Sequence, residues 1–188
     1  MLISWLEIAQ RYGDWWKDDC FWFYTERPAI SILAGAVWNL KGVVLEEFGS
    51  AKSSVTEGDR KGRCDIAFKV SRETSYDGEA KHVWCHLDEA PEQAIARVND
   101  KLAIACRDIG AWKSSLNPLA IVFVSFVISG TGENKGAPKE NRRKAKQNRP
   151  TWLPAFLADF QKRSDIHLAW HIRPDADCPG AAIIIQTC

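Results

Sequence analysis

The sequence predicts an α/β protein in which a mixed central β-sheet is flanked by helices. Three observations support this fold class. Helical patterns alternate with strand patterns along the chain, one predicted strand is a continuous apolar run, and a length of 188 residues suits a single domain. The chain is 46% apolar and carries a net charge of +1, so any signature of nucleic-acid binding must be local. The expected order is αβββαβ over residues 28–128, followed by a C-terminal extension of a helix and strands at 150–188.

The first part of the chain is expected to hold two helices. A short helix is predicted at residues 2–12, within an aromatic segment that ends near residue 27. A second helix is predicted from Pro28 to about Phe48, because proline fits the first helical turn and apolar residues recur on one stripe. Glu47 falls within that stripe and Glu46 falls to its side. Residues 51–57 show a weak strand pattern.

A β-hairpin is predicted next, over residues 64–84. Its first arm is apolar and β-branched, its second arm alternates between apolar and polar residues, and a polar, turn-like segment joins them. Glu79 and Lys81 lie two residues apart on the second arm, so their side chains point to the same face. A register that brings Asp65 opposite them gathers two carboxylates and a lysine on one patch of sheet. Carboxylate oxygens suit a hard cation such as Mg²⁺.

The remaining elements follow from periodicity and composition. Pro91 precedes an amphipathic helix, and the longest apolar run, Leu119–Ile128, is typical of a strand that is buried on both faces. The second half of the chain is therefore predicted to contain a helix at residues 92–109, a buried strand at 119–128 and a loop at 130–150. A short helix at 152–162 and two strands at 167–172 and 181–186 are predicted to follow.

The order of elements and the acidic pattern resemble the PD-(D/E)XK nuclease superfamily, which has the restriction-endonuclease-like fold. The resemblance covers about residues 28–128, and Cys64 stands where the motif name has proline. In that family an acidic residue at the end of the second core strand and a Glu-x-Lys on the third bind a divalent metal. A glutamate on the first helix often completes the site. Here Asp65 matches the acidic residue, and Glu79-Ala80-Lys81 matches the Glu-x-Lys.

The resemblance implies a single nuclease-like domain that hydrolyses phosphodiester bonds of nucleic acid, with DNA as the expected substrate. Mg²⁺, or Mn²⁺ as its substitute, is then held by Asp65, Glu79, the Ala80 carbonyl and a helical glutamate. That glutamate is matched by Glu47, with Glu46 as the alternative. Lys81 is expected to position the attacking water or to offset charge on the phosphate. Many members of the superfamily act as dimers, which keeps a homodimer open.

Two groups of residues are candidates for contacting the nucleic acid. Gln93 and Arg97 lie four apart on one face of the predicted second helix, and in several branches of the superfamily a polar residue of this helix reaches the active site. A solvated helix face is the alternative. The segment of the predicted loop from Lys135 to Arg149 also carries seven basic residues against a single Glu140, which suits contact with phosphates, although charge runs also form plain solvated loops. These basic residues are Lys135, Lys139, Arg142, Arg143, Lys144, Lys146 and Arg149.

The cysteine pattern and the termini bear on the compartment. The six cysteines are scattered without a C-x-x-C pair, and we expect reduced thiols in a cytoplasmic protein. No apolar run is long enough to span a bilayer, so no membrane partner is expected. Two other function classes stay open. The chain could be a non-catalytic module that binds nucleic acid or protein on a nuclease-like fold, or an assembly protein that docks through its aromatic N-terminus.

Overall fold

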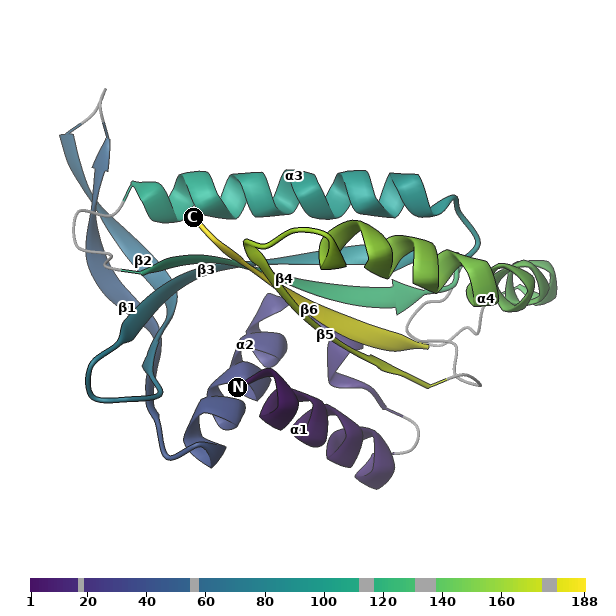
Figure 1. Ribbon diagram of the computed structural model, residues 1–188, viewed down its shortest axis with the longest axis horizontal. Coiled ribbons are helices and arrows are strands. Elements are labelled where there is room, and N and C mark those ends of the chain that lie inside the picture. The colour runs from purple at the N-terminus through teal and green to yellow at the C-terminus, as the bar shows by residue number, and fades with distance from the viewer. Residues whose placement is uncertain (17–18, 55–57, 112–116, 131–137, 174–178) are drawn as a thin grey trace.

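The computed structural model shows a six-stranded mixed sheet between two layers of helices (Figure 1). It describes residues 1–16, 19–54, 58–111, 117–130, 138–173 and 179–188, and for residues 50–54 and 58–61 the backbone alone. The described elements are, in chain order, α1 (Leu2–Trp15), the short 3-10 helix η1 (Phe21–Phe23), α2 (Glu26–Asn39), β1 (Val43–Ser54), β2 (Gly58–Lys69), β3 (Ser75–His86), α3 (Pro91–Gly110), β4 (Pro118–Val127), α4 (Lys139–Gln161), β5 (Ile166–Ile172) and β6 (Gly180–Thr187).

The strands are ordered β1-β2-β3-β4-β6-β5 across the sheet. Only the β3–β4 pair is parallel among the described ladders, and α3 is the crossover that connects these two strands. Parallel neighbours need such a crossover, because a tight turn can only join antiparallel strands. The predicted order αβββαβ is confirmed by α2, β1, β2, β3, α3 and β4.

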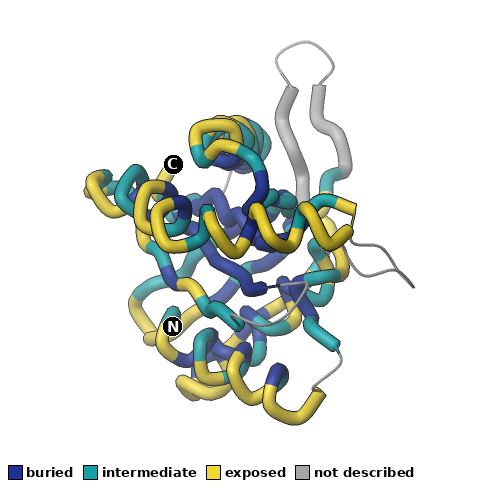
Figure 2. The backbone as a smooth tube through the Cα atoms, turned by 90° about the vertical axis from the view of Figure 1, so that its right-hand side faces the viewer, coloured by how far each residue is buried: buried dark blue, intermediate teal, exposed yellow. Residues whose placement is uncertain are grey.

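Two hydrophobic cores lie on opposite faces of this sheet. One core holds buried residues of α1, η1 and α2, and the other holds those of α3 and α4. Residues of β4 alternate between the two cores, with Ile121 in the first and Val122 in the second, and almost the whole strand is buried, as predicted. Figure 2 shows the buried strands between helices whose outer surfaces are exposed. The aromatic N-terminus belongs to the first core, because Trp5, Phe21 and Trp22 are buried there.

The predicted helix of residues 28–48 is wrong in its second half. α2 ends at Asn39, and β1 begins at Val43. Lys41 has a φ of 59°, and a Cβ on Gly42 would meet the Lys69 carbonyl oxygen at 2.5 Å, so the chain must turn here rather than continue as a helix. Glu46 and Glu47 consequently lie on a strand and not on a helix.

The predicted loop of residues 130–150 is also wrong from Lys139 onward. α4 runs for 23 residues from Lys139 to Gln161 and includes Pro150 and Pro154. Lys, Arg, Glu, Gln and Ala are good helix formers, and their propensity outweighs the repulsion between the like charges. The C-terminal half of α4 buries Trp152 and Phe156 against the second core. Lys135 lies outside the described residues.

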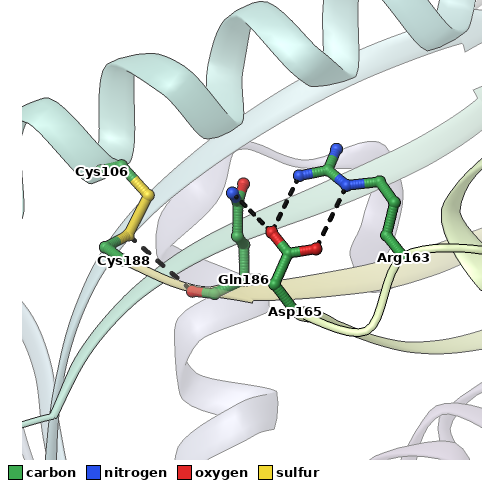
Figure 3. Close-up of a disulfide and its surroundings, with 5 residues drawn as sticks. All are labelled: Cys106, Arg163, Asp165, Gln186 and Cys188. Atoms are coloured by element: carbon green, nitrogen blue, oxygen red, sulfur yellow. Dashed lines mark hydrogen bonds and ion pairs between the residues drawn. A yellow bond between two sulfur atoms is a disulfide. The ribbon is translucent and has the colours of Figure 1, made fainter.

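The expectation that every cysteine is reduced is wrong. A disulfide joins Cys106 of α3 to Cys188 at the end of β6 (Figure 3). The two residues are 82 positions apart in sequence, but α3 packs on β4 and β6 pairs with β4, which brings their Cα atoms to 5.4 Å, within reach of a disulfide. Cys20, Cys64 and Cys85 are thiols rather than members of a disulfide, and Cys178 lies outside the described residues.

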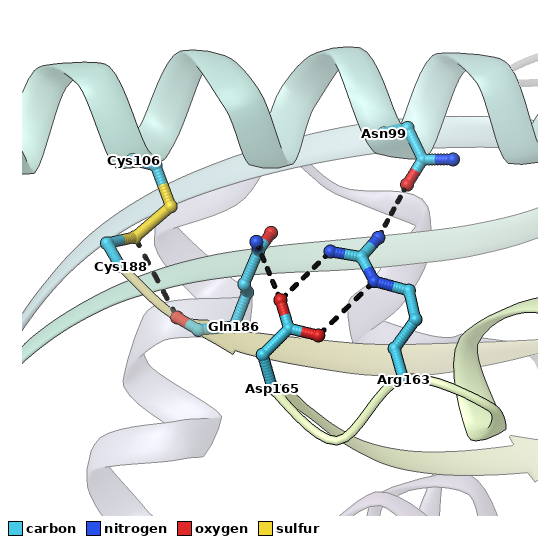
Figure 4. A network of polar contacts seen from close by, with 6 residues as sticks. All are labelled: Asn99, Cys106, Arg163, Asp165, Gln186 and Cys188. Atoms are coloured by element: carbon cyan, nitrogen blue, oxygen red, sulfur yellow. Dashed lines mark hydrogen bonds and ion pairs between the residues drawn. A yellow bond between two sulfur atoms is a disulfide. The ribbon is translucent and has the colours of Figure 1, made fainter.

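A polar network supports the same junction between α3 and β6 (Figure 4). Arg163 donates from Nη1 to Asn99 Oδ1 on α3 at 3.0 Å, and it forks onto the carboxylate of Asp165 through Nε and Nη2 at 3.4 and 3.1 Å. Gln186 of β6 donates to the same carboxylate at 3.0 Å. The hydrogen bond from Arg163 lowers the pKa of Asp165. The turn between α4 and β5 is thereby fixed to both neighbours.

Reduction of the Cys106–Cys188 bond is expected to lower the free energy of unfolding by about 2–4 kcal/mol, because the bond restricts a long loop of the unfolded chain. Guanidinium unfolding with and without dithiothreitol measures this change. Cys20→Ser, which removes a thiol that is not part of the disulfide, is the control and should leave the difference unaltered. Alkylation of both Cys106 and Cys188 in the non-reduced protein would contradict the pairing.

Candidate active site

The β2–β3 ladder is short, and the two strands part at Asp65 and Glu79. The described pairs run from Lys69 opposite Ser75 to Ile66 opposite Gly78. From that point β2 continues along β1, whereas β3 continues along β4. Asp65 and Glu79 occupy the next pair of positions, at the opening of this fork. A Cβ on Gly78 would meet the side chains of Ile121 and Ile66 at 2.6 and 2.9 Å, so glycine lets the strands pack closely just before the fork.

One carboxylate bridges the fork and gathers the predicted residues. Oδ2 of Asp65 accepts a hydrogen bond from the backbone N–H of Ala80 at 2.8 Å. The two neighbours of Ala80 also contact each other, because Lys81 Nζ lies 2.9 Å from Glu79 Oε1. Lys81 Nζ further lies 3.5 Å from Asp108 Oδ2 on α3. The structure therefore brings Asp65, Glu79 and Lys81 together, and only 6% of Glu79 is exposed.

Lys81 is held in its charged form. Burial lowers the pKa of its ammonium, but the hydrogen bond to Glu79 and the negative charges of Glu79, Asp65 and Glu26 outweigh burial. The pKa of Lys81 is therefore raised above its ordinary value of 10.5. A lysine with a raised pKa is a poor proton acceptor near neutral pH, so this side chain suits charge stabilisation rather than general-base work.

Glu26 is a member of this site that the sequence prediction missed. It lies in the first turn of α2, and its pKa is raised to about 7. Burial is the largest cause, and repulsion from Asp65 follows; the positive charge of Lys81 opposes the rise, and Glu79 and Glu47 add to it. The glutamate that α2 contributes therefore lies at the start of the helix, whereas the sequence predicts a glutamate near the end of the helix. The position of Glu26 just before Pro28 was the available signal, because acidic residues and proline favour the first helical turn.

Glu47 lies in the same row of the sheet as Asp65, although it is not on a helix. Because Glu46 pairs with Ile66 and Phe48 pairs with Cys64, Glu47 stands directly opposite Asp65. Its φ of 50° lies in the left-handed region, which is uncommon for a residue other than glycine.

The carboxylates of Glu47 and Glu46 have different partners. Glu47 forms ion pairs with Arg27 Nε at 2.6 Å and with Arg63 Nη1 at 3.3 Å. Glu46 instead accepts a hydrogen bond from Ser31 Oγ of α2 at 2.9 Å. Of the two glutamates, Glu47 is therefore the one whose place in the β1–β2 register adjoins Asp65.

The carboxylates at the fork are of the ligand type that a hard divalent cation prefers. Mg²⁺ is typically bound through one or two carboxylates together with water and substrate phosphates, and Asp65 and Glu79 supply two carboxylates from adjoining strands. Burial first, and then repulsion from Asp65, raises the pKa of Glu26, so a cation at the fork would favour the ionised form of Glu26. Within the described residues, no three His, Cys, Asp or Glu side chains are grouped closely enough to hold a metal ion. The expected contribution of the Ala80 carbonyl stays a prediction.

Gln93 and Arg97 lie away from the fork. Both belong to the N-terminal half of α3, whereas Asp108, which contacts Lys81, is near its C-terminal end. The axial rise of a helix separates Gln93 from Asp108 by about 22 Å. Arg97 pairs with Glu89 at 2.9 Å, and Gln93 lines a cavity of about 580 Å³ between α3 and α4. Their role in contacting nucleic acid stays a prediction. If they do contact it, they do so at a distance from the carboxylates of the fork.

The basic residues of α4 also lie far from the fork. Its first turns extend beyond the sheet at the end opposite the β1–β2 arm (Figure 1). Five basic side chains are exposed there, and Arg143 pairs with Glu140 at 2.7 Å. The exposed residues are Lys139, Arg142, Arg143, Lys144 and Lys146.

Comparison of the chain with family models, with curated proteins and with solved structures finds no match. The likeness to PD-(D/E)XK nucleases therefore rests on the order of elements and on the convergence of Asp65, Glu79 and Lys81. In the described part of the chain, no helix is long and apolar enough to cross a bilayer.

Glu26→Gln is expected to flatten the pH dependence of stability. The folded protein keeps the Glu26 proton up to about pH 7, whereas the unfolded chain releases it near the ordinary pKa of 4.5. The free energy of unfolding of the wild type should therefore fall as pH rises through this window, and the variant should lack this component. Urea unfolding at pH 5 and pH 8 measures the difference. Glu7→Gln, at an exposed position of α1, is the control, and an identical pH dependence in wild type and Glu26→Gln would contradict the assignment.

Proposed function

We propose that this protein is a metal-dependent nuclease that hydrolyses phosphodiester bonds of nucleic acid, with DNA as the expected substrate. The observation that supports it is the convergence at the fork of Asp65 and Glu79 with Lys81, which lies 2.9 Å from Glu79. Carboxylates from two adjoining strands beside a charged lysine are suited to hold a cation next to a phosphate. The resemblance to PD-(D/E)XK nucleases points to the same chemistry.

Each residue has a separate part in this proposal. Asp65 and Glu79 hold Mg²⁺ or Mn²⁺, with the Ala80 carbonyl as a further donor. The bound cation lowers the pKa of a water ligand and stabilises charge on the phosphate. The Ala80 N–H keeps Asp65 turned toward β3, and Asp108 keeps Lys81 Nζ at the fork. Lys81 remains protonated and offsets the negative charge that develops on the phosphoryl oxygens.

Glu26 carries a proton that it can release when a cation binds at the fork. Its pKa of about 7 places it near half-ionisation at neutral pH, and a positive charge at the fork favours its ionised form. Binding of a divalent cation should therefore strengthen as pH rises through 7. Glu26 takes the place that the sequence prediction gave to a glutamate at the other end of the helix.

A binding module is the second candidate, because one observation favours it. The exposed basic turns of α4 lie at the opposite end of the sheet from the carboxylates, so they can bind nucleic acid without taking part in its cleavage. The aromatic N-terminus is divided, because Trp5, Phe21 and Trp22 are part of the core whereas Trp15, Trp16 and Tyr24 are exposed, so docking of a partner through this segment stays a prediction.

Compartment and assembly state are part of the same proposal. The cytoplasmic location expected from the sequence is opposed by the Cys106–Cys188 bond, because disulfides persist mainly in oxidising compartments. A homodimer stays a proposal that derives from the family resemblance. Sedimentation of the purified protein at several concentrations tests the assembly state.

Glu79→Gln and Asp65→Asn are each expected to reduce cleavage of plasmid DNA in Mg²⁺ by at least about a hundredfold, because each removes a charged ligand while keeping the side-chain shape. EDTA should abolish cleavage by the wild type. Glu73→Gln, on the exposed turn between β2 and β3, is the matched control and should cleave normally. Undiminished cleavage by Glu79→Gln would refute the catalytic assignment.

The double variant Arg142→Gln/Lys146→Gln tests the contribution of α4. Two exposed cations on successive turns should each release about one counterion on contact with phosphates, so the slope of log affinity against log salt should fall by about 2. Fluorescence anisotropy with a labelled duplex between 50 and 300 mM salt, roughly the range in which counterion release dominates, measures the slope. Lys162→Gln, at the other end of α4, is the control. An unchanged slope in the double variant would show that α4 does not contact the duplex.

A further inference from the structure

Two arginines from different elements converge on one carboxylate beside the fork. Arg27 of α2 and Arg63 of β2 both form ion pairs with Glu47 of β1. Both side chains are exposed, 68% for Arg27 and 53% for Arg63. Arg27 follows Glu26 in sequence, and Arg63 lies two residues before Asp65 on the same face of β2. The two guanidinium groups are therefore anchored next to the proposed catalytic residues.

The charge balance of this cluster favours an exchange of partners. Two cations share one carboxylate, and exposed ion pairs contribute little free energy, so they are easily replaced. A guanidinium group matches the oxygens of a phosphate with two parallel hydrogen bonds. A phosphodiester that approaches the fork meets these two cations and can take the place of Glu47.

The strand register indicates where the Glu47 carboxylate can move when the arginines release it. It stands directly opposite Asp65, and Asp65 occupies the position next to Glu79 across the fork. The charges of Asp65, Glu79 and Glu47 each raise the pKa of Glu26, so each of these three carboxylates lies near enough to Glu26 to interact with it. A released Glu47 carboxylate therefore adds negative charge to the proposed cation site.

We propose that Arg27 and Arg63 bind a phosphate of the nucleic-acid strand and exchange it for Glu47. The exchange couples the two ligands of the site, because strand binding releases a carboxylate toward the cation. Since coupling between two binding sites is reciprocal, the cation also strengthens strand binding. The identity of the strand and of the cation rests on the proposed function, whereas the exchange itself requires no cation.

Binding in EDTA separates this exchange from a merely structural role of the ion pairs. Fluorescence anisotropy with a labelled oligonucleotide should show about two- to fivefold tighter binding by Glu47→Gln, the effect of removing a competitor held by exposed ion pairs. Arg27→Gln/Arg63→Gln should bind more weakly, with a salt slope lower by about 2. Arg11→Gln, exposed on α1, should match the wild type. Glu47→Asn, which tolerates the left-handed backbone, serves as a second variant if Glu47→Gln is unstable.

The outcomes distinguish failure of the exchange from failure of the proposed function. Unchanged or weaker oligonucleotide binding by folded Glu47→Gln and Glu47→Asn would overturn the exchange. Inorganic phosphate at the same phosphate concentration should compete poorly, and equal competition would overturn the assignment to a strand. In a parallel Mn²⁺ titration, the wild type should bind Mn²⁺ and Glu79→Gln should not. Tighter strand binding by Glu47→Gln in EDTA, together with no Mn²⁺ binding by the wild type, would support the exchange and refute the nuclease.

Discussion

The hydrogen bond from the Ala80 N–H to Asp65 is the interaction on which the candidate site depends. It stands at the position where the β2–β3 ladder ends, so a side chain replaces the backbone contact that the parting strands have lost. Because Ala80 lies between Glu79 and Lys81, the bond also fixes how these two residues stand relative to Asp65. A sheet that forks at a carboxylate therefore places ionisable groups from two strands at one opening.

Electrostatics at the fork follow from this arrangement. Glu26, Asp65 and Glu79 bring negative charge into a partly buried region, and Lys81 alone balances only part of it. Burial and the neighbouring carboxylates raise the pKa of Glu26, and the same carboxylates keep Lys81 charged, so a divalent cation at the fork would change both pKa values. The basic turns of α4 lie beyond the other end of the β3–α3–β4 unit. The seven steps along β3 from Glu79 to His86 span about 23 Å, so a duplex that contacts both regions must extend over several base pairs.

Local patterns predicted much of this fold, and long-range contacts explain what they missed. The hairpin and the convergence of Asp65, Glu79 and Lys81 follow from alternation and from the spacing of two residues. Glu26 is not visible as a site residue in the sequence because its charge interacts with residues 21 or more positions away. The sequence favours a helix at Glu47 because the close approach of Gly42 to Lys69 is not visible in it. The same limit applies to Cys106 and Cys188, whose proximity depends on β4 lying between distant segments. The charge run at the start of α4 is typical of a solvated loop, but the helix propensity of its residues decides the structure that it adopts.

Asp65 and Glu79 are the proposed ligands of a divalent cation beside Lys81. The most direct measurement is anomalous diffraction from crystals grown with Mn²⁺, which locates the metal without reference to activity. We expect one or more anomalous peaks at the fork, each from a metal ion that is bonded to carboxylate oxygens of Asp65 and Glu79. Saturating Mn²⁺ that leaves no peak at these two carboxylates would contradict it.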